Sequence, residues 1–310
     1  MTCYNEGPYI VAAVRSVLDQ SRAEWIDAIV IADDGSDAAT LAVLREIESW
    51  DVRIRVLYGP GGVGLPGQRR VAIAETDAPV LAILDGDDLW TPDKLERQLP
   101  VLATDDAVGL VYADFCVFPN HDLAAARRAG VLDITRNAPL SLGYFLNDPP
   151  IIPSTTLLRR TDYDSAGGFD AAVRVFEDTD FYLRLARVTR FALVDTPLLY
   201  KRQRGSSITG GRSDLMAHHA FVAFKAASDE AALLPHVPRR LAERARKLGN
   251  QRFLLNDRAG AVRLLWLAVR LDPLNRRAWQ SLLAARVFPG LALRMLGSGG
   301  RARQAALGAV

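Results

Sequence analysis

Short apolar runs alternate with amphipathic stretches through the first third of the chain. Four runs, most of which end at acidic or glycine residues, predict buried strands at residues 26–32, 52–58, 80–84 and 107–112. Apolar positions spaced three and four apart predict helices between them, at residues 8–20, 37–50, 68–75 and 91–102. Strands separated by helices imply right-handed crossovers, so we expect an α/β fold with a mostly parallel, doubly wound sheet.

The pattern changes further along the chain. Residues 113–150 read as irregular, and residues 151–202 as a second compact stretch. Beyond about residue 210 only helical patterns occur, and the one that ends in Leu-Asp-Pro-x-Asn at residues 271–275 weakly resembles a tetratricopeptide helix. Only Met1 to Tyr4 precede the first predicted helix, so a first strand there would be very short, or the chain starts late. If the chain really begins at Met1, we expect a weakened sheet and low activity.

Composition excludes several classes of protein. Of 310 residues, 49% are apolar and 24% charged, as in ordinary globular proteins. Two cysteines cannot form a disulfide framework, and four histidines argue against a histidine-rich metal centre. No apolar run approaches the roughly 18 residues of a transmembrane helix, and the first residues do not read as a secretory signal. We therefore expect a cytoplasmic protein, free or peripheral at the cytoplasmic face of the membrane.

Charge is divided unevenly along the chain. Residues 1–200 hold 18 basic and 30 acidic residues, a net charge of −12, whereas residues 201–310 hold 20 and 6, a net charge of +14. Arginines that solvate the outer faces of helices would explain the basic part, and so would a surface for an anionic partner such as lipid headgroups. Nucleic acid is not an expected partner, because the basic residues are spread out and no aromatic residues are interleaved with them.

Acidic residues follow two of the predicted strands. Asp33 and Asp34 end one, and Asp85, Asp87 and Asp88 end another. Ligands of open parallel sheets bind beyond the carboxyl ends of the strands, so both clusters are expected in one crevice. Like charges this close favour a divalent cation, for which carboxylate and phosphate oxygens are suitable ligands. The alternative is that Asp87 or Asp88 caps the following helix.

Two further motifs allow more than one interpretation. Glu177 and Asp178 stand at a predicted helix start, where the helix dipole stabilises acids and where a carboxylate could also act as a general base. Residues 62–67 satisfy the dinucleotide-binding pattern G-x-G-x-x-G, and Asp85 ends the next strand. The short helix after this motif and the clustered acids argue against a dinucleotide-binding oxidoreductase, which stays an alternative.

Taken together, the motifs resemble those of the family 2 glycosyltransferases, inverting enzymes with the GT-A fold. The resemblance covers residues 1–205 in the order that the family keeps. It is carried by the segments Thr2-Cys-Tyr-Asn-Glu-Gly-Pro-Tyr-Ile, Asp33-Asp-Gly-Ser-Asp, Leu84-Asp-Gly-Asp-Asp-Leu-Trp, Ser154-Thr-Thr-Leu-Leu-Arg-Arg and Glu177-Asp-Thr-Asp-Phe. It implies a catalytic domain over residues 1–210, and the basic helical region then spans residues 211–310.

The resemblance implies a nucleotide-sugar donor, typically linked to UDP. Asp34 matches the acid that hydrogen-bonds the base, and Arg69 the arginine near the donor. The residues that match the nucleoside contacts of the first strand are Thr2, Tyr4 and Glu6.

It also implies a metal and a catalytic base. Asp85 and Asp87 match the DxD pair that holds Mn²⁺ or Mg²⁺, with Asp87 as the direct ligand and Asp85 nearer the ribose. Asp178 matches the base. Many relatives carry a histidine where this chain has a glutamine between Arg202 and Arg204, and these two arginines are candidates for phosphate contacts instead.

The implied reaction moves one sugar to a hydroxyl of a glycan or of a lipid-linked acceptor. The glycine-rich segment 205–211 is the candidate for closing over the site. A non-catalytic nucleotide-sugar-binding or scaffold protein of the same fold is the alternative. The basic C-terminal helices, with Trp266 and Leu267, are either a bundle packed on the catalytic domain, a protein-docking module or a peripheral membrane contact.

Overall fold

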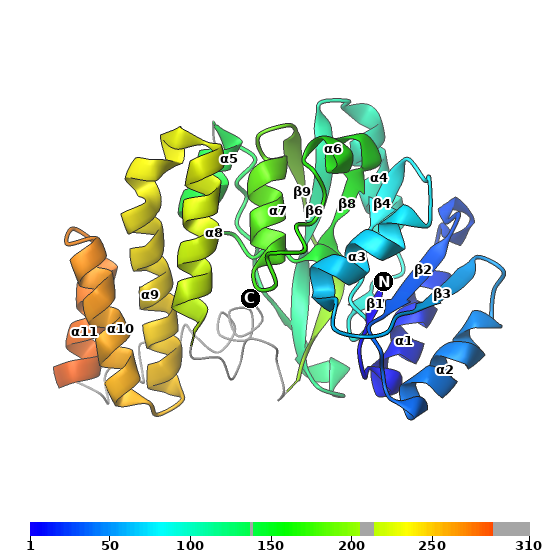
Figure 1. Ribbon diagram of the computed structural model, residues 1–310, viewed down its shortest axis with the longest axis horizontal. Coiled ribbons are helices and arrows are strands. Elements are labelled where there is room, and N and C mark those ends of the chain that lie inside the picture. The colour runs from blue at the N-terminus through cyan, green and yellow to red at the C-terminus, as the bar shows by residue number, and fades with distance from the viewer. Residues whose placement is uncertain (137–138, 205–213, 288–310) are drawn as a thin grey trace. The chain divides into compact units, whose positions relative to one another are not determined.

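The computed structural model describes residues 1–136, 139–204 and 214–287. They form two compact units, one from residues 1–141 and 149–204, the other from residues 142–148 and the described residues after 213 (Figure 1). The segment 205–211, for which we predict closure over the site, lies outside the described residues.

The first unit begins with a parallel three-stranded sheet. Its order is β1 (Thr2–Cys3), β2 (Ile29–Asp33) and β3 (Ile54–Tyr58), connected by α1 (Gly7–Leu18) and α2 (Ala38–Glu48). All residues of β2 are buried, as expected of a strand covered on both faces. This part confirms the predicted alternation of strands and helices, and the first strand is two residues long.

The second sheet of this unit is mixed. Only the long central strands β6 and β9 pair in parallel, whereas the pairs β4–β8, β6–β8, β6–β7 and β5–β9 are antiparallel. The expected mostly parallel sheet is therefore found in the first sheet and not in this one. The short strands have two or three residues each, too few for a hydrophobic repeat to reveal them. In spatial order the sheet comprises β4 (Val80–Ala82), β8 (Leu157–Arg159), β6 (Val108–Pro119), β9 (Arg190–Gln203) and β5 (Leu89–Trp90), with β7 (Arg127–Arg128) beside β6.

Two contacts of these strands matter for the site. A bridge between Thr2 and Asp85 joins the first sheet to the end of β4. β6 continues to Pro119, which corrects the expectation that irregular structure begins at residue 113. Its continuation is stabilised by fully buried aromatic side chains such as Phe115 and Phe118.

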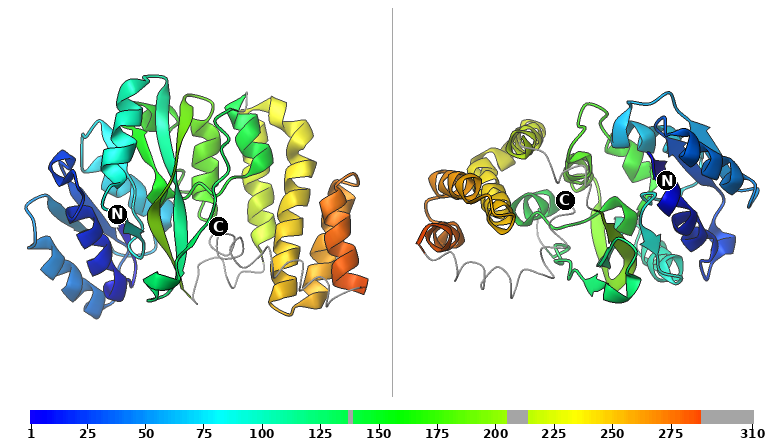
Figure 2. Two further views of the ribbon diagram at one scale, coloured as in Figure 1. Left: turned by 180° about the vertical axis from the view of Figure 1, so that it is seen from behind. Right: turned by 90° about the horizontal axis from the view of Figure 1, so that it is seen from below.

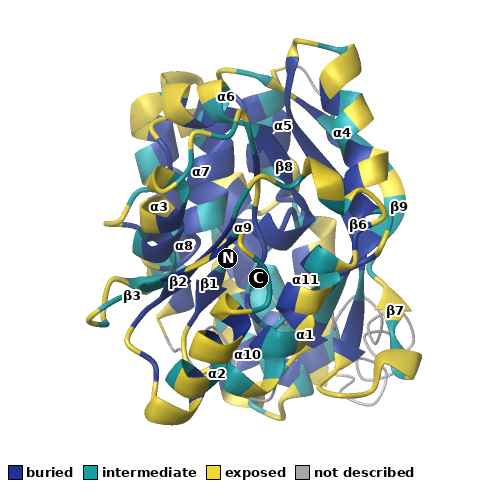
Figure 3. Ribbon diagram, turned by 90° about the vertical axis from the view of Figure 1, so that its right-hand side faces the viewer, coloured by how far each residue is buried: buried dark blue, intermediate teal, exposed yellow. Residues whose placement is uncertain are grey.

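Helices cover both faces of the sheets. α3, α6 and α7 lie on the face seen in Figure 1, and α1 and α4 on the face seen from behind in Figure 2. The strands β2 and β6 are buried along most of their length, while the helices keep exposed outer faces (Figure 3). The additional helices are α3 (Gly64–Ala74), α4 (Lys94–Thr104), α6 (Arg160–Ser165) and α7 (Glu177–Leu185).

The second unit is helical in its described part, and the predicted C-terminal helices are confirmed. Close packing of two of them depends on Gly249, where a Cβ atom would lie 2.8 Å from the Leu265 side chain. No helix among the described residues is long and apolar enough to cross a membrane. The helices are α5 (Leu140–Asn147), which begins in the first unit, α8 (Leu215–Asp229), α9 (Val237–Leu254), α10 (Arg258–Leu271) and α11 (Arg276–Val287).

A buried ionic cluster ties this unit together. Asp148, at the end of α5, accepts hydrogen bonds from Arg240 and Arg244 of α9 and from Lys247 at 3.2 Å. Although burial acts in the opposite direction, these cations hold the pKa of Asp148 well below its usual range. His219 of α8 is also buried, and burial with the nearby arginines lowers its pKa to about 2.

Candidate active site

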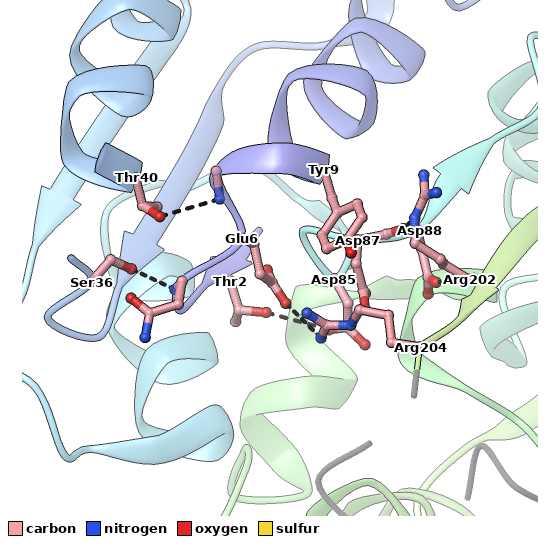
Figure 4. A network of polar contacts seen from close by, with 12 residues as sticks. Thr2, Glu6, Tyr9, Ser36, Thr40, Asp85, Asp87, Asp88, Arg202 and Arg204 are labelled. Atoms are coloured by element: carbon pink, nitrogen blue, oxygen red, sulfur yellow. Dashed lines mark hydrogen bonds and ion pairs between the residues drawn. The ribbon is translucent and has the colours of Figure 1, made fainter. Parts of the chain in front are cut away.

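Gly86 lets the acidic loop after β4 pass close to the first strand. A Cβ atom at this position would lie 2.3 Å from Oε2 of Glu6 and 2.7 Å from the carbonyl oxygen of Thr2. Asp85 is held beside it, because its amide donates to Ser154 Oγ at 3.0 Å and its Oδ1 lies 3.4 Å from Thr2 Oγ1. The start of the chain, with Thr2 and Glu6, thus lies beside the Asp85 cluster (Figure 4).

The carboxylates gathered here are largely buried. Burial, with Asp87 as the main charged neighbour, raises the pKa of Glu6 to about 9. Burial and the neighbouring carboxylates also raise the pKa of Asp88 to about 7 and that of Asp87 above its usual value. The alternative that Asp87 or Asp88 caps the next helix is wrong, because the residue that precedes α4 is Asp93. The cluster therefore favours an added cation.

Two arginines at the end of β9 supply positive charge (Figure 4). Arg204 places Nε 2.7 Å from Oδ2 of Asp87 and Nη2 3.1 Å from Oε1 of Glu6. Arg202 instead bonds main-chain carbonyls, with Nε 2.9 Å from that of Asp87 and Nη1 on that of Asn120. Both arginines were predicted to contact phosphate. Arg202 is held by the main chain around the site, whereas Arg204 pairs with the side chains of Asp87 and Glu6.

Arg69 connects the acidic loop to α7. Its buried guanidinium donates from Nη2 to Asp85 at 2.9 Å and from Nη1 to Glu177 at 2.7 Å, and it lies over the Phe169 ring. Burial raises the pKa of Glu177 to about 7 although Arg69 acts in the opposite direction. For Asp85, which keeps more contact with solvent, Arg69 holds the pKa below its usual value against the effect of burial.

The start of α7 has a constrained backbone. Phe176 has φ 62° and ψ 34°, a left-handed conformation that is uncommon for a bulky residue and is often found at functional sites. Directly after it, Glu177 faces Arg69, and Asp178 is partly exposed and accepts a hydrogen bond from the Thr179 amide at 2.6 Å. Arg69 thereby links the acid next to the predicted base with the first aspartate of the predicted metal pair.

The glycine-rich loop is held by Asp34. The two carboxylate oxygens accept hydrogen bonds from the amides of Val63 and Gly64, each at 2.9 Å, where α3 begins. Base recognition by Asp34 stays a prediction, since this carboxylate also shapes the loop. Tyr4, another predicted nucleoside contact, is 58% exposed beside β1. Asp34 thus holds the glycine-rich loop at residues 62–67, which matches the dinucleotide-binding pattern.

Two residues of the site, Ser154 and Lys201, were missed from sequence. Glu177 was named beside Asp178 as a candidate acid, but its pairing with Arg69 was not predicted. Ser154 lies in a family motif to which the sequence assigns no role. Lys201 of β9 gave no signal. It is half-buried, and the charges of Asp88 and Asp85 raise its pKa against the effect of burial. Lys201 therefore offsets part of the negative charge of the loop.

The acidic loop fits a divalent cation that is completed by its ligand. Within the described residues no three His, Cys, Asp or Glu side chains are grouped so as to hold a metal by themselves. Mg²⁺ is usually held by one or two carboxylates together with phosphate oxygens and water. Asp85 and Asp87 could provide the carboxylates. Among the described residues, Oδ2 of Asp88 is buried without a hydrogen-bond partner, so this carboxylate keeps an unused acceptor beside Asp85 and Asp87.

The fold defines the class. The chain shares the GT-A fold of TarS from S. aureus, solved with UDP-GlcNAc (TM-score 0.61, 15% identity, 95% of this chain and 90% of that one). It is equally similar to the mannosyltransferase PcManGT from Pyrobaculum calidifontis, solved with GDP-Man and Mn²⁺ (TM-score 0.62, 18% identity, 99% and 84%). At these identities the likeness establishes the fold alone.

The sequence defines the family. Residues 1–165, more than half of the chain, match the profile of glycosyl transferase family 2, and the chain belongs to that family. Among curated relatives, 123 residues are 32% identical to WfgD of Escherichia coli, named as a UDP-Glc:α-D-GlcNAc-diphosphoundecaprenol β-1,3-glucosyltransferase. This match spans 40% of the chain and 47% of WfgD, so the chain covers less than half of that relative. The predicted family and fold are confirmed.

Proposed function

We propose that the chain transfers a sugar from a nucleotide donor, UDP-linked, to a hydroxyl acceptor, with inversion at the anomeric carbon. The observation that carries this proposal is the buried Arg69, which holds Asp85 and Glu177 in one network. Asp87, the proposed metal ligand near the diphosphate, lies close to Asp85 in the chain. Asp178, the proposed base for the acceptor hydroxyl, directly follows Glu177. Arg69 thus connects the proposed metal-binding loop with the helix start that carries the proposed base. The UDP-Glc in the name of WfgD, to which part of the chain is 32% identical, supports a UDP-linked donor.

The roles of the chain's residues follow from their chemistry. Thr2, Tyr4, Glu6 and Asp34 would contact the nucleoside, and Asp87 with Asp85 would hold Mn²⁺ or Mg²⁺. Such a cation would neutralise charge that develops on the leaving diphosphate. Asp178 would accept the proton of the acceptor hydroxyl while its oxygen bonds to the anomeric carbon. The bond from that carbon to the diphosphate oxygen breaks, and the nucleoside diphosphate leaves with the electron pair.

Substitution of the base tests the proposal. Asp178→Asn is expected to lower sugar transfer by at least about a hundredfold, the usual size of a general-base contribution, while UDP still binds. Asp106→Asn is the matched control, because Asp106 is fully exposed in the segment between α4 and β6. Unchanged transfer by Asp178→Asn would contradict the assigned base. A wild-type chain that binds the donor but transfers to no acceptor would support the non-catalytic alternative.

We also propose that α10 and α11 contact an anionic membrane surface, which suits a lipid-linked acceptor. Trp266 and Trp279 are both partly exposed and pack edge to face with ring centroids 6.1 Å apart. Leu274, between the helices, is 90% exposed. Tryptophan, leucine and arginine on one surface are typical of helices that lie in the membrane interface. The exposed arginines of these helices include Arg263, Arg270, Arg276, Arg277 and Arg286.

Vesicle flotation tests this contact. The chain is expected to float with vesicles that contain phosphatidylglycerol and not with pure phosphatidylcholine, and Trp266→Ser with Trp279→Ser should abolish flotation. Trp25→Ser is the control, because Trp25 is 45% exposed but belongs to the other unit. Equal flotation of both variants would contradict the proposed surface. The cytoplasmic location stays a prediction.

A further inference from the structure

Arg204 occupies the position beside Asp87 at which we expect a divalent cation. Its guanidinium bridges the carboxylates of Asp87 and Glu6, with Nε on Oδ2 of Asp87 at 2.7 Å. It also lies over the Tyr9 ring, 5.5 Å from the ring centroid. These acids come from the loop after β4 and from the residue before α1, so the arginine joins two segments that are distant in the chain (Figure 4).

The neighbouring arginine is held in a different way. Arg202 is 9% exposed, bonds two main-chain carbonyls and stacks between the rings of Tyr9 and Phe118, at 4.8 and 4.6 Å. The contacts found for Arg204 among the described residues are to side chains, and its own side chain is 24% exposed. Arg204 stands one residue beyond the end of β9. It can therefore leave its partners by side-chain rotation, whereas Arg202 cannot.

We propose that Arg204 is a replaceable counter-ion, which occupies Oδ2 of Asp87 in the nucleotide-free protein and gives this oxygen up to a divalent cation when the donor binds. This inference rests on the proposed function, since it takes Asp87 as a metal ligand. One carboxylate oxygen cannot hold the guanidinium at 2.7 Å and a directly bound cation at once. The exchange frees a guanidinium, whose planar donors suit the phosphate oxygens of the diphosphate.

The exchange has two consequences of opposite sign. Without nucleotide, Arg204 competes with the metal, so the metal alone should bind weakly. With nucleotide, the released guanidinium gains the diphosphate as a partner, so metal and nucleotide should strengthen each other's binding. An arginine that only stabilised the fold would produce neither effect, and one that only bound phosphate would not weaken binding of the metal alone.

Binding of Mn²⁺ without nucleotide, followed by electron paramagnetic resonance of the free ion, tests the first consequence. Arg204→Gln is expected to raise the Mn²⁺ affinity by about tenfold, because one positive charge close to the cation is removed. Arg190→Gln is the matched control, since it removes the same charge at the other end of β9, where Arg190 is 69% exposed and pairs with Asp105. The control should leave the Mn²⁺ affinity unchanged.

A double substitution assigns the effect to the shared oxygen. In the Asp87→Asn background, Arg204→Gln should no longer raise the Mn²⁺ affinity, and in the wild-type background it should reduce the enhancement of Mn²⁺ binding by UDP. Thermal unfolding of each variant confirms that the compared proteins are folded. Equal or weaker Mn²⁺ binding by Arg204→Gln would overturn the exchange, and so would an increase that persists without Asp87.

The two proposals can fail separately. If Asp87→Asn alone leaves Mn²⁺ binding unchanged, the metal role of Asp87 in the proposed function is wrong, and the exchange is wrong with it. If Asp87→Asn abolishes Mn²⁺ binding while Arg204→Gln does not strengthen it, the metal site stands and the counter-ion role of Arg204 is refuted.

Discussion

Replacement of Arg69 by methionine removes the link between the acidic loop and α7. Arg69 makes two charge-assisted hydrogen bonds, 2.7 Å to Glu177 and 2.9 Å to Asp85. Loss of one partner from a buried ion pair typically costs 3–5 kcal/mol, because a charge is left buried without compensation. Glu177 is 7% exposed, whereas the Asp85 side chain is 22% exposed and can be rehydrated. We therefore expect Arg69→Met to lower the free energy of unfolding by about 3 kcal/mol, mostly through Glu177.

The destabilisation should depend on pH. The pKa of Glu177 is already raised to about 7 in the folded chain, above 4.5 for an exposed glutamate, and loss of Arg69 raises it further. A raised folded-state pKa means that the folded state takes up the proton first, so its stability falls as pH rises through that pKa. Below about pH 7 both proteins lose stability equally as pH rises, and above it only Arg69→Met continues to do so. Its cost should therefore be larger at pH 8 than at pH 6, by up to about 1.4 kcal/mol.

Hydrogen exchange in increasing urea measures this cost for the first unit alone, if it is followed on peptides of β6. Arg174→Met is the control, since Arg174 is exposed and its guanidinium donates to the Gly62 carbonyl at 3.3 Å; it should change stability by less than about 0.5 kcal/mol. Adding Glu177→Gln to Arg69→Met should restore most of the loss, because no buried charge is then left unpaired. A loss below 1 kcal/mol for Arg69→Met, or no rescue, would refute the reasoning.

Two further substitutions test the loop and the helical unit. Gly86→Ala places a methyl group 2.3 Å from Oε2 of Glu6 and 2.7 Å from the Thr2 carbonyl, so we expect a loss of about 1–3 kcal/mol and weaker UDP binding, measured by thermal unfolding and calorimetry. His219 has its pKa lowered from 6.5 to about 2 by burial, so its unfolded form binds protons first and stability is lost as pH falls below about 6.5. His219→Gln should flatten this loss between pH 6.5 and 4.5, measured by exchange of α9 amides, whereas His218→Gln should not.

Local patterns predicted much of the fold, because the long apolar runs and helical repeats report directly on burial. β2, β3 and the C-terminal helices follow from such patterns. The mixed half of the sheet does not, since β5 and β8 have two and three residues and owe their places to pairing with longer strands. The end of β6 was missed because the residues after 112 carry a charge, Asp114, which is fully buried and accepts the amides of Gly130 and Val131 at 3.1 Å.

The site was predicted as a set of residues rather than as a network. The position of the Asp85 cluster follows from the rule that ligand sites form at the carboxyl ends of strands, whereas the approach of Glu6 to Asp87 was not predicted. The pairing of Arg69 with Glu177 spans 108 positions of the chain, and no local pattern reports on a contact of that range. The bridge from Arg204 to Glu6 and Asp87 is equally remote, and the hydrogen bonds that Asp34 accepts from the glycine-rich loop depend on the backbone of that loop.

Calorimetric titration of UDP with and without Mn²⁺ tests the central claim most directly. If Asp85 and Asp87 form a metal-assisted diphosphate site, UDP should bind with Mn²⁺ at least about tenfold more tightly than in EDTA, and Asp87→Ala should remove the difference. UDP that binds with the same affinity in Mn²⁺ and in EDTA would contradict the claim.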